Sequence, residues 1–278
     1  MLVLSALSSA LCFGVADYMG GRASKSHPAL VVTLLGQSAA LVALFLVAWG
    51  SGVPVPGVSD WAWGGAAGIA GSTGLIAFYR AMGSGYMTVA APVSAVITGA
   101  IPIGIGLLQG ERPGVLALVG MPIALVAVVL VSDVLGPDHR RAPRWVVLLA
   151  AVSGAVFGSL FVMLDQTSGT SGAWPVVAMR AASVPYMVLV VTLSRTNPRV
   201  PSQALPIVLV SGVLDSLANA LFLFATRQGL MSVVAVILAL YPASTLLLAV
   251  RVDREKIHGS QAVGLAMAAT ALVLVAVS

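Results

Sequence analysis

Residues 85–91 read Gly-Tyr-Met-Thr-Val-Ala-Ala, and residues 229–235 read Gly-Leu-Met-Ser-Val-Val-Ala, so a similar stretch returns after 144 positions. Matched alanines and valines mean little in so apolar a chain, but the same offset also pairs rarer residues elsewhere. The pairs are Ser9 with Ser153, Phe13-Gly14 with Phe157-Gly158, Pro54 with Pro198, Glu111 with Glu255, and Gly120 with Gly264. Self-similarity at one fixed offset indicates that the chain is a duplicated half.

Each half is built from apolar segments long enough to cross a bilayer. Hydrophobic residues make up 59% of the chain and charged residues only 8%, whereas soluble domains carry about 25% charged residues. About 20 helical residues span the hydrocarbon core. Ten such segments fall at 2–20, 29–49, 61–82, 86–108, 114–132, 145–164, 173–194, 205–226, 230–250 and 258–277. The sequence predicts an all-α integral membrane protein.

The two halves are expected to have opposite orientations in the membrane. Five segments per half is an odd number, so the second copy enters from the other side, which makes the halves inverted repeats. Charge supports this, because the first loop of the first half carries Arg22 and Lys25, whereas the first loop of the second half has no Lys or Arg. We therefore predict ten transmembrane helices as two inverted five-helix repeats, at residues 1–135 and 144–278.

The basic residues also predict which side faces the cytoplasm. Ten of the 14 Lys and Arg residues fall in or beside the loops after helices one, five, seven and nine: Arg22, Lys25, Arg140, Arg141, Arg144, Arg195, Arg199, Arg251, Arg254 and Lys256. Arg112 and Arg227 lie in the opposite loops. The positive-inside rule then predicts a multi-pass protein of the plasma or inner membrane with both termini outside.

Several classes of function lack the residues they need. Cys12 is the only cysteine, and the three histidines, His27, His139 and His258, lie in or beside loops, so we expect no disulfide, metal site or cofactor. The chain has no HExxH, GxSxG or paired intramembrane aspartates, so it is not expected to be an enzyme. It also lacks a Walker A motif and the charged rings of a channel. The net charge of +5 reflects loop topology, so no nucleic-acid partner is expected.

Three recurring features resemble the drug/metabolite transporter superfamily, specifically its ten-helix EamA-type members. They are the Phe-Gly pair near the end of the first helix of each half, the Gly-x-Met-[Thr/Ser]-Val that opens the fourth helix, and the Glu that closes it. Residues 239–245, Ala-Leu-Tyr-Pro-Ala-Ser-Thr, are similar to the second-half signature. The resemblance implies that helices one, three, four, six, eight and nine enclose a central cavity, that helices five and ten are peripheral, and that the solute is exported.

The chain departs from that family in four places. Phe13 and Phe157 stand where Trp is frequent, and Arg254 replaces the Gly before the second closing Glu. An Arg common in the second helix of each half is present only as Arg180, since Gly36 occupies the matching position. Family members are commonly drawn with both termini in the cytoplasm, which conflicts with the orientation that the charges predict.

Asp215 is the strongest candidate for chemistry inside the membrane, because ionisable groups there cost at least roughly 2.5–3.5 kcal/mol. It lies near the centre of segment 205–226, with Asn219 one turn further along the same face. Together they could bind a cation, a substrate amine or a proton, or they could form an interhelical polar clamp. Arg180 could bind an anionic group or neutralise Asp215.

Four other residues are substrate or coupling candidates: Asp17, Tyr18, Tyr79 and Tyr241. Asp17 and Tyr18 could simply be solvated at the interface, but the matching residues of the second half are apolar, Phe161 and Val162. The framework and gating candidates are Phe13, Gly14, Phe157, Gly158, Pro92, Pro242, Glu111 and Glu255. For the two glutamates, a loop ion pair or a helix cap is the more economical explanation.

The sequence thus favours a secondary transporter that moves a small metabolite or drug-like solute by alternating access around a midplane cavity, without ATP. A proton-independent facilitator or exchanger is the alternative, ahead of a channel or an intramembrane enzyme. Few ionisable groups predict a neutral, zwitterionic or weakly cationic solute. The expected partners are that solute and the lipid bilayer. The sequence leaves open whether protons are the coupling ion and whether the protein is a monomer or a homodimer.

Overall fold

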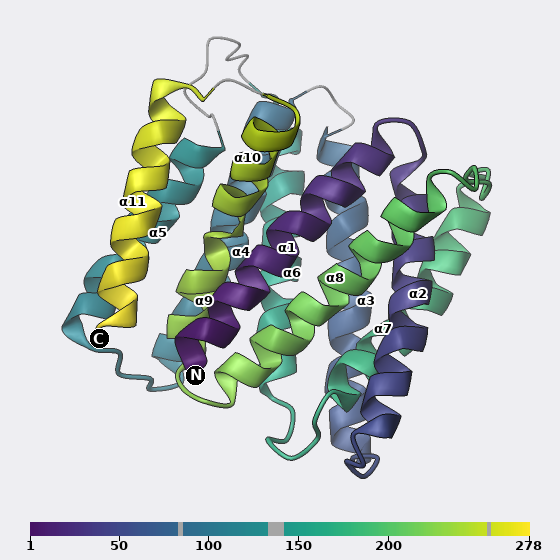
Figure 1. The fold of residues 1–278 in the computed structure, drawn as a ribbon, viewed down its shortest axis with the longest axis horizontal. Helices are drawn as coiled ribbons and strands as arrows, with labels where there is room; N and C mark the ends of the chain where they lie inside the picture. The colour runs from purple at the N-terminus through teal and green to yellow at the C-terminus, as the bar shows by residue number, and fades with distance from the viewer. Residues whose placement is uncertain (83–85, 133–141, 255–256) are drawn as a thin grey trace.

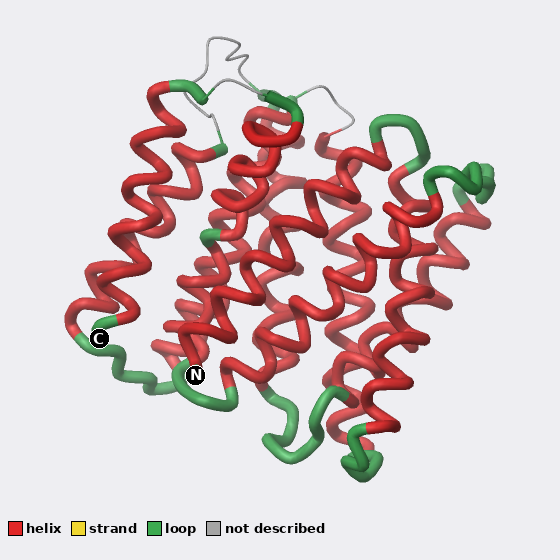
Figure 2. Tube along the Cα trace, viewed as in Figure 1, coloured by secondary structure: helices red, strands yellow, loops and turns green. Residues whose placement is uncertain are grey.

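The structure is a computed structural model that describes residues 1–82, 86–132, 142–254 and 257–278, without the side chains of Tyr79, Met82, Met87 and Thr88. Within these ranges all regular elements are helices (Figures 1 and 2). They are α1 (Leu2–Ser24), α2 (Ala29–Gly50), α3 (Val58–Met82), α4 (Met87–Leu108), α5 (Val115–Val131), α6 (Arg144–Asp165), α7 (Trp174–Leu193), α8 (Leu205–Thr226), α9 (Met231–Ala239), α10 (Tyr241–Val252) and α11 (Gly259–Ala276).

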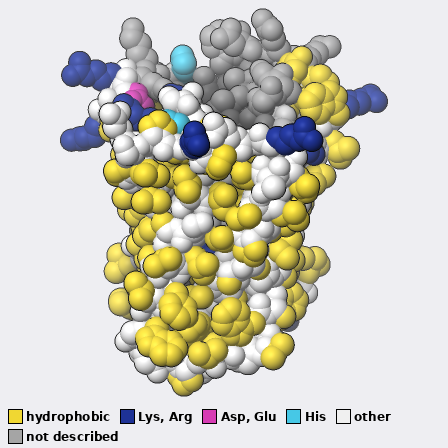
Figure 3. All heavy atoms as spheres, turned by 90° about the vertical axis from the view of Figure 1, so that its right-hand side faces the viewer, with side chains coloured by type: hydrophobic (Ala, Val, Ile, Leu, Met, Phe, Trp, Pro, Cys, Tyr) yellow, Lys and Arg dark blue, Asp and Glu magenta, His cyan; other side chains and the backbone are white. Residues whose placement is uncertain are grey.

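The predicted all-helical membrane fold is confirmed. Eight helical segments have the length and apolar composition of membrane spans, with α9 and α10 counted together as Met231–Val252. On the face drawn in Figure 3, apolar side chains are spread along the flank, whereas Lys and Arg gather at one end. A water-soluble protein would bury these side chains, so the exposed apolar flank fits a lipid environment.

The predicted segment 230–250 is two helices rather than one. The break is at Leu240, whose backbone N–H bonds to the carbonyl of Ile237 at 3.2 Å in a tight turn of the 3₁₀ type. Pro242, two residues further on, has no backbone N–H to continue the α-helical ladder. The proline favours a break here, but it does not require one, since the counterpart α4 contains Pro92 and Pro102 and is continuous.

The repeats are interlocked rather than placed side by side. The helix pairs with the most extensive contacts all join one repeat to the other: α1 with α8, α5 with α11, α3 with α6, α4 with α6, and α3 with α7. The contact of α1 with α8 has its counterpart in α6 with α3, as expected for two inverted copies. Most of the packing in the bundle is therefore contact between the halves (Figure 1).

Individual hydrogen bonds repeat at the same offset as the sequence. Ser9 Oγ donates to the Ala218 carbonyl at 2.7 Å, and Ser153 Oγ donates to the Gly74 carbonyl at 2.9 Å. Both donors and both acceptors are 144 positions apart in the chain. The duplication found in the sequence is therefore reproduced in the three-dimensional packing.

Glycines permit the closest helix crossings. A Cβ at Gly68 in α3 would collide with the backbone carbonyl of Met179 in α7, and one at Gly36 in α2 would lie 3.0 Å from the Cα of Gly212 in α8. Small residues at such crossings let membrane helices approach at backbone distance. The two crossings are related by the repeat.

The ends of the bundle differ in charge. We call the end with the loops that start at Lys25, Ser132, Ser194 and Asp253 the basic side, and the end with both chain termini the terminal side (Figure 1). Arg227, on the terminal side, donates to the carbonyls of Gly172 and Ser168 at 2.9 and 3.0 Å. Partial burial lowers the pKa of its guanidinium, and the residue holds the loop between α6 and α7.

We predict that the terminal side faces the cell exterior. In a Cys12→Ala background, a cysteine introduced at exposed Ser278 should react with an impermeant maleimide in intact cells, because the basic loops are retained inside. A cysteine at exposed Asn197, on the basic side, should be protected until the membrane is permeabilised. The reverse labelling pattern would contradict this orientation. Asp138, Arg140, Arg141 and Lys256, which belong to the basic loops, lie outside the described residues.

Candidate functional site

A cavity of about 1070 Å³ lies between the two repeats. It is lined by helices one, three, four, six and eight, and by α9 and α10, which together form helix nine, as the resemblance implies. α5 reaches it only through its last residue, Val131, and the lining residues include none from α11. The lining also includes residues of α2 from Ala29 to Gln37, which the sequence had not indicated.

Among the described residues, the lining of the cavity extends to one end of the bundle and not to the other. Lys25 and Ser132 line it at the basic side, and Phe13, Phe161 and Tyr241 line its inner end. The Phe13 ring centroid lies 6.0 Å from that of Phe161 and 6.1 Å from that of Tyr241. Phe222 lies behind them and is fully buried. Its ring centroid is 4.7 Å from that of Phe161. We call these four rings the aromatic layer; they separate the cavity from the terminal side.

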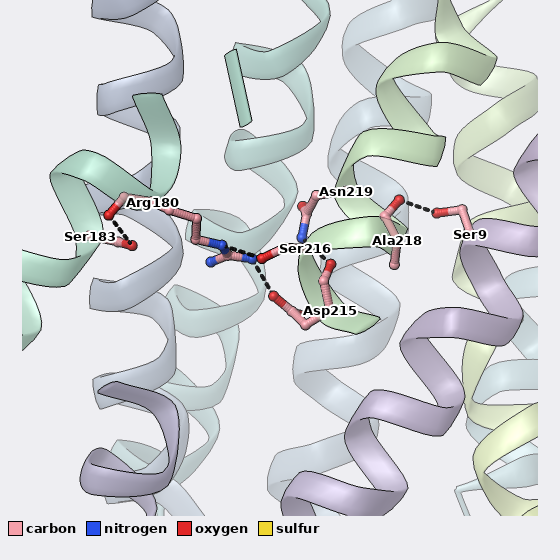
Figure 4. A network of polar contacts seen from close by, with 7 residues as sticks. All are labelled: Ser9, Arg180, Ser183, Asp215, Ser216, Ala218 and Asn219. Carbon is pink, nitrogen blue, oxygen red and sulfur yellow. Dashed lines mark hydrogen bonds and ion pairs between the residues drawn. The ribbon is translucent and has the colours of Figure 1, made fainter. Parts of the chain in front are cut away.

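Arg180 of α7 and Asp215 of α8 form an ion pair in the cavity wall (Figure 4). Arg180 Nε also donates to Ser216 Oγ at 2.6 Å. The Arg180 side chain is 5% exposed and that of Asp215 37% exposed, so the cation is the buried partner and the carboxylate faces the cavity. Of the roles that the sequence left open for Arg180, the geometry favours neutralisation of Asp215.

Asn219 lies one turn further along α8 than Asp215, in the cavity wall. Its Nδ2 donates to the Asp215 carbonyl at 2.8 Å, which fixes the amide orientation (Figure 4). Its Oδ1 is buried and has no hydrogen-bond partner among the described residues. The Asn219 Oδ1 atom is therefore available in the cavity wall as a hydrogen-bond acceptor.

Asp17 and Tyr18 are neighbours in the sequence but lie in different surroundings. Asp17 lines the cavity. Tyr18 points to the end of α10, where its hydroxyl donates to Asp253 Oδ2 at 2.9 Å and Arg22 Nη1 bonds to Asp253 Oδ1 at 2.6 Å. Tyr18 thus ties α1 to α10 at the basic side, and only Asp17 belongs to the cavity.

Tyr241 and Pro242 lie in the cavity wall at the break between α9 and α10. The Tyr241 carbonyl accepts a hydrogen bond from Ser244 Oγ at 2.7 Å, so the first turn of α10 is stabilised by a side chain. A helix interruption beside a central cavity is typical of transporter binding sites. The side chain of Tyr79, the other tyrosine candidate, lies outside the described part.

Glu111 connects the repeats through a helix terminus. Its Oε1 accepts the backbone N–H of Met231 at 2.7 Å, and its Oε2 accepts that of Ser232 at 2.9 Å, so it caps the N-terminus of α9. A carboxylate is stabilising there because the first backbone N–H groups of a helix have no intrahelical partner. The matching Glu255 lies outside the described residues.

Of the other framework candidates, the two glycines lie at contacts between the repeats. Gly14 packs against Ser244, and a Cβ at Gly158 would lie 2.6 Å from Ile101 Cβ. Phe13, Phe157 and Pro242 line the cavity, whereas Pro92 is buried within α4.

Gln37 is the main cavity residue that the sequence reasoning missed. It is 9% exposed, lines the cavity from α2, and its Oε1 is buried without a hydrogen-bond partner in the described structure. A glutamine inside the apolar segment 29–49 was the signal that could have revealed it.

Comparisons with known proteins agree with this architecture. A model of the EamA-like transporter family matches the chain twice, over residues 1–133 and 144–277. A solved structure described only as "Crystal structure of protein" aligns with 98% of this chain and 95% of its own, with a TM-score of 0.83 and 16% sequence identity. At that identity the likeness concerns the fold alone. No curated protein matches the chain in sequence.

Proposed function

Because this chain belongs to the EamA-like transporter family, we propose that it is a secondary transporter that moves a small organic solute across the membrane without ATP. The cell membrane is its proposed location, with the lipid bilayer and the solute as its partners. Alternating access is the proposed mechanism, in which the two repeats open the cavity first to one side and then to the other.

The observation that carries this proposal is a central cavity that reaches only one end of the bundle. A continuous pore would favour a channel, whereas here the aromatic layer lies between the cavity and the terminal side. The wall is contributed by both repeats, so a change in their relative position would alter access. About 1070 Å³ suits a small organic molecule.

We propose export as the direction of transport. With the basic side in the cytoplasm, the solute enters the cavity from the cytoplasm. The solute would be released outside when Lys25 moves toward Ser132 and the rings of the aromatic layer move apart. Asp215 is the proposed proton-coupling group if transport is driven by protons. Exchange without protons needs no titratable group and is the alternative.

Proteoliposomes loaded with a defined mixture of amino acids, amines and sugar derivatives test the proposal. We expect wild-type protein to release at least one solute faster than protein-free vesicles, measured by mass spectrometry of the external medium. External unlabelled solute should also drive uptake of its labelled form, because counterflow is a property of a carrier with alternating access. Imposed pH gradients distinguish proton coupling from simple exchange.

Two tryptophan variants provide the matched control. Ala95→Trp adds a large ring to a residue of the cavity wall and should abolish release. Leu118→Trp adds the same ring to α5 at a residue that is 45% exposed on the outside of the bundle, and should leave release unchanged. Equal release by Ala95→Trp and wild type, or no release of any solute by wild type, would refute the proposed function.

A further inference from the structure

We propose that the transported solute carries an ammonium group and that Asp17 is the residue that binds it. This inference rests on the proposed function, because it assigns a substrate class to the same cavity. Three independent features of the cavity wall support it: its charge balance, its unpartnered acceptors, and the asymmetry of its polar residues between the repeats.

The charge balance inside the cavity leaves Asp17 uncompensated. Among the described residues, the other charged groups deep in the lining are Arg180 and Asp215, which pair with each other. Lys25 lies eight residues further along α1, about 12 Å at the helical rise, and lines the rim. Among the described residues no side chain forms a hydrogen bond or ion pair with Asp17, although it is exposed to the cavity. A bound cation would neutralise it.

Three buried polar atoms of the wall have no partner among the described residues: two amide oxygens, which only accept, and the hydroxyl of Ser24, which can accept or donate. Asn219 Oδ1 and Gln37 Oε1 are both buried without partners among the described residues, and both side chains line the cavity. The Asn219 amide cannot turn to offer its nitrogen instead without losing its bond to Asp215. An ammonium group has three N–H donors and no acceptor. A donor-rich ligand therefore complements this wall better than an anion does.

The polar residues of the cavity break the repeat. At the offset of 144, Asp17 matches Phe161, Gln37 matches Ala181, Arg180 matches Gly36, Asp215 matches Gly71, and Asn219 matches Leu75. By contrast, the hydrogen bonds of Ser9 and Ser153, which join helices of the shared architecture, are present in both copies. The duplicated architecture therefore does not itself require this polar set.

Aromatic residues beside Asp17 fit the hydrocarbon part of such a ligand. Phe13 lies one turn below Asp17 on the same face of α1, a rise of about 6 Å. Phe157, Phe161 and Tyr241 add further rings to the wall. An arylalkyl amine could place its nitrogen at Asp17 and its ring against Phe13, where aromatic faces also attract cations.

Calorimetric titration of the purified full chain in detergent tests the inference with 2-phenylethylamine and its neutral analogue 2-phenylethanol. Wild type should bind the amine at least about 10-fold more tightly than the alcohol, because a charge-assisted hydrogen bond is lost with the alcohol. Asp17→Asn should weaken amine binding roughly 10- to 100-fold and leave alcohol binding unchanged. Asp17→Glu should retain most of the amine affinity.

Asp253→Asn is the matched control, since it removes the same charge from the ion pair with Arg22 outside the cavity and should leave amine binding unchanged. Equal binding of amine and alcohol by wild type, or no binding of the amine, would overturn the inference even if Asp17→Asn failed to fold. The proteoliposome assay separates the two proposals: release of sugar derivatives but not amines would sustain transport and refute the ammonium preference.

Discussion

Asp215→Asn should destabilise this protein more than Arg180→Met does, although both substitutions break the same ion pair. Arg180 is the buried partner, so Asp215→Asn leaves a guanidinium with 5% exposure uncompensated, at a cost of about 3 kcal/mol. Arg180→Met leaves Asp215, which is 37% exposed to the cavity and can be hydrated. We expect a cost of roughly 1 kcal/mol there, near the centre of the distribution for single substitutions.

Apparent melting temperatures and the monodisperse fraction of the detergent-purified variants measure this difference. The double variant Arg180→Met with Asp215→Asn should recover much of the loss, because no unpaired charge remains. Asp253→Asn breaks an exposed pair instead and should cost at most about 1 kcal/mol. If Asp215→Asn were as stable as wild type but lost accumulation driven by a pH gradient, the pair would serve coupling rather than structure.

Gly68→Ala should have a similarly large effect, although it adds a single methyl group. The new Cβ would collide with the backbone carbonyl of Met179, and neither α3 nor α7 can move a backbone atom aside without shifting the whole crossing. Over-packing of this kind costs roughly 1–3 kcal/mol, and we expect the upper end because the obstacle is backbone.

Gly65→Ala is the matched control on the same helix. Its Cβ would lie 3.6 Å from Ala182 Cβ, an ordinary contact, and alanine is the better helix former by about 1 kcal/mol. The Gly65 variant should therefore melt at or above the wild-type temperature, while the Gly68 variant melts lower or aggregates on size-exclusion chromatography. Equal melting of the two variants would show that the α3–α7 crossing is looser than this structure has it.

The architecture could be predicted from the sequence because segment length and internal duplication together determine it. Ten apolar segments of sufficient length define the spans, and Ser9, Phe13 and Glu111 with their counterparts define the duplication. The number of segments in each half then determines the inversion. The break at Leu240 could not be predicted, because α4 contains two prolines and stays continuous, so proline alone does not decide where a span is interrupted.

The cavity residues could be predicted only in part. In a soluble protein, the polar residues of a helix mark the face that is exposed to water. In a membrane, the residues that face lipid and those that face the core are both apolar. The composition of a membrane helix therefore does not tell which of its faces points to the core. Asp17 and Tyr18 were therefore indistinguishable in the sequence, although one lines the cavity and the other joins α10. The contacts of Glu111 with Met231 and Ser232 also needed the fold, since the partners are over 100 residues away.

The interlocked packing has a consequence for how such a chain could have arisen and how it assembles. Since α1 and α3 have their main partners in α8 and α6, a single five-helix unit would present its best-packed faces to lipid. Two identical copies inserted in opposite orientations would cover those faces for each other, which is the packing expected of an antiparallel homodimer before fusion. During synthesis, the first five helices likewise remain exposed to lipid until the second five are inserted and pack against them.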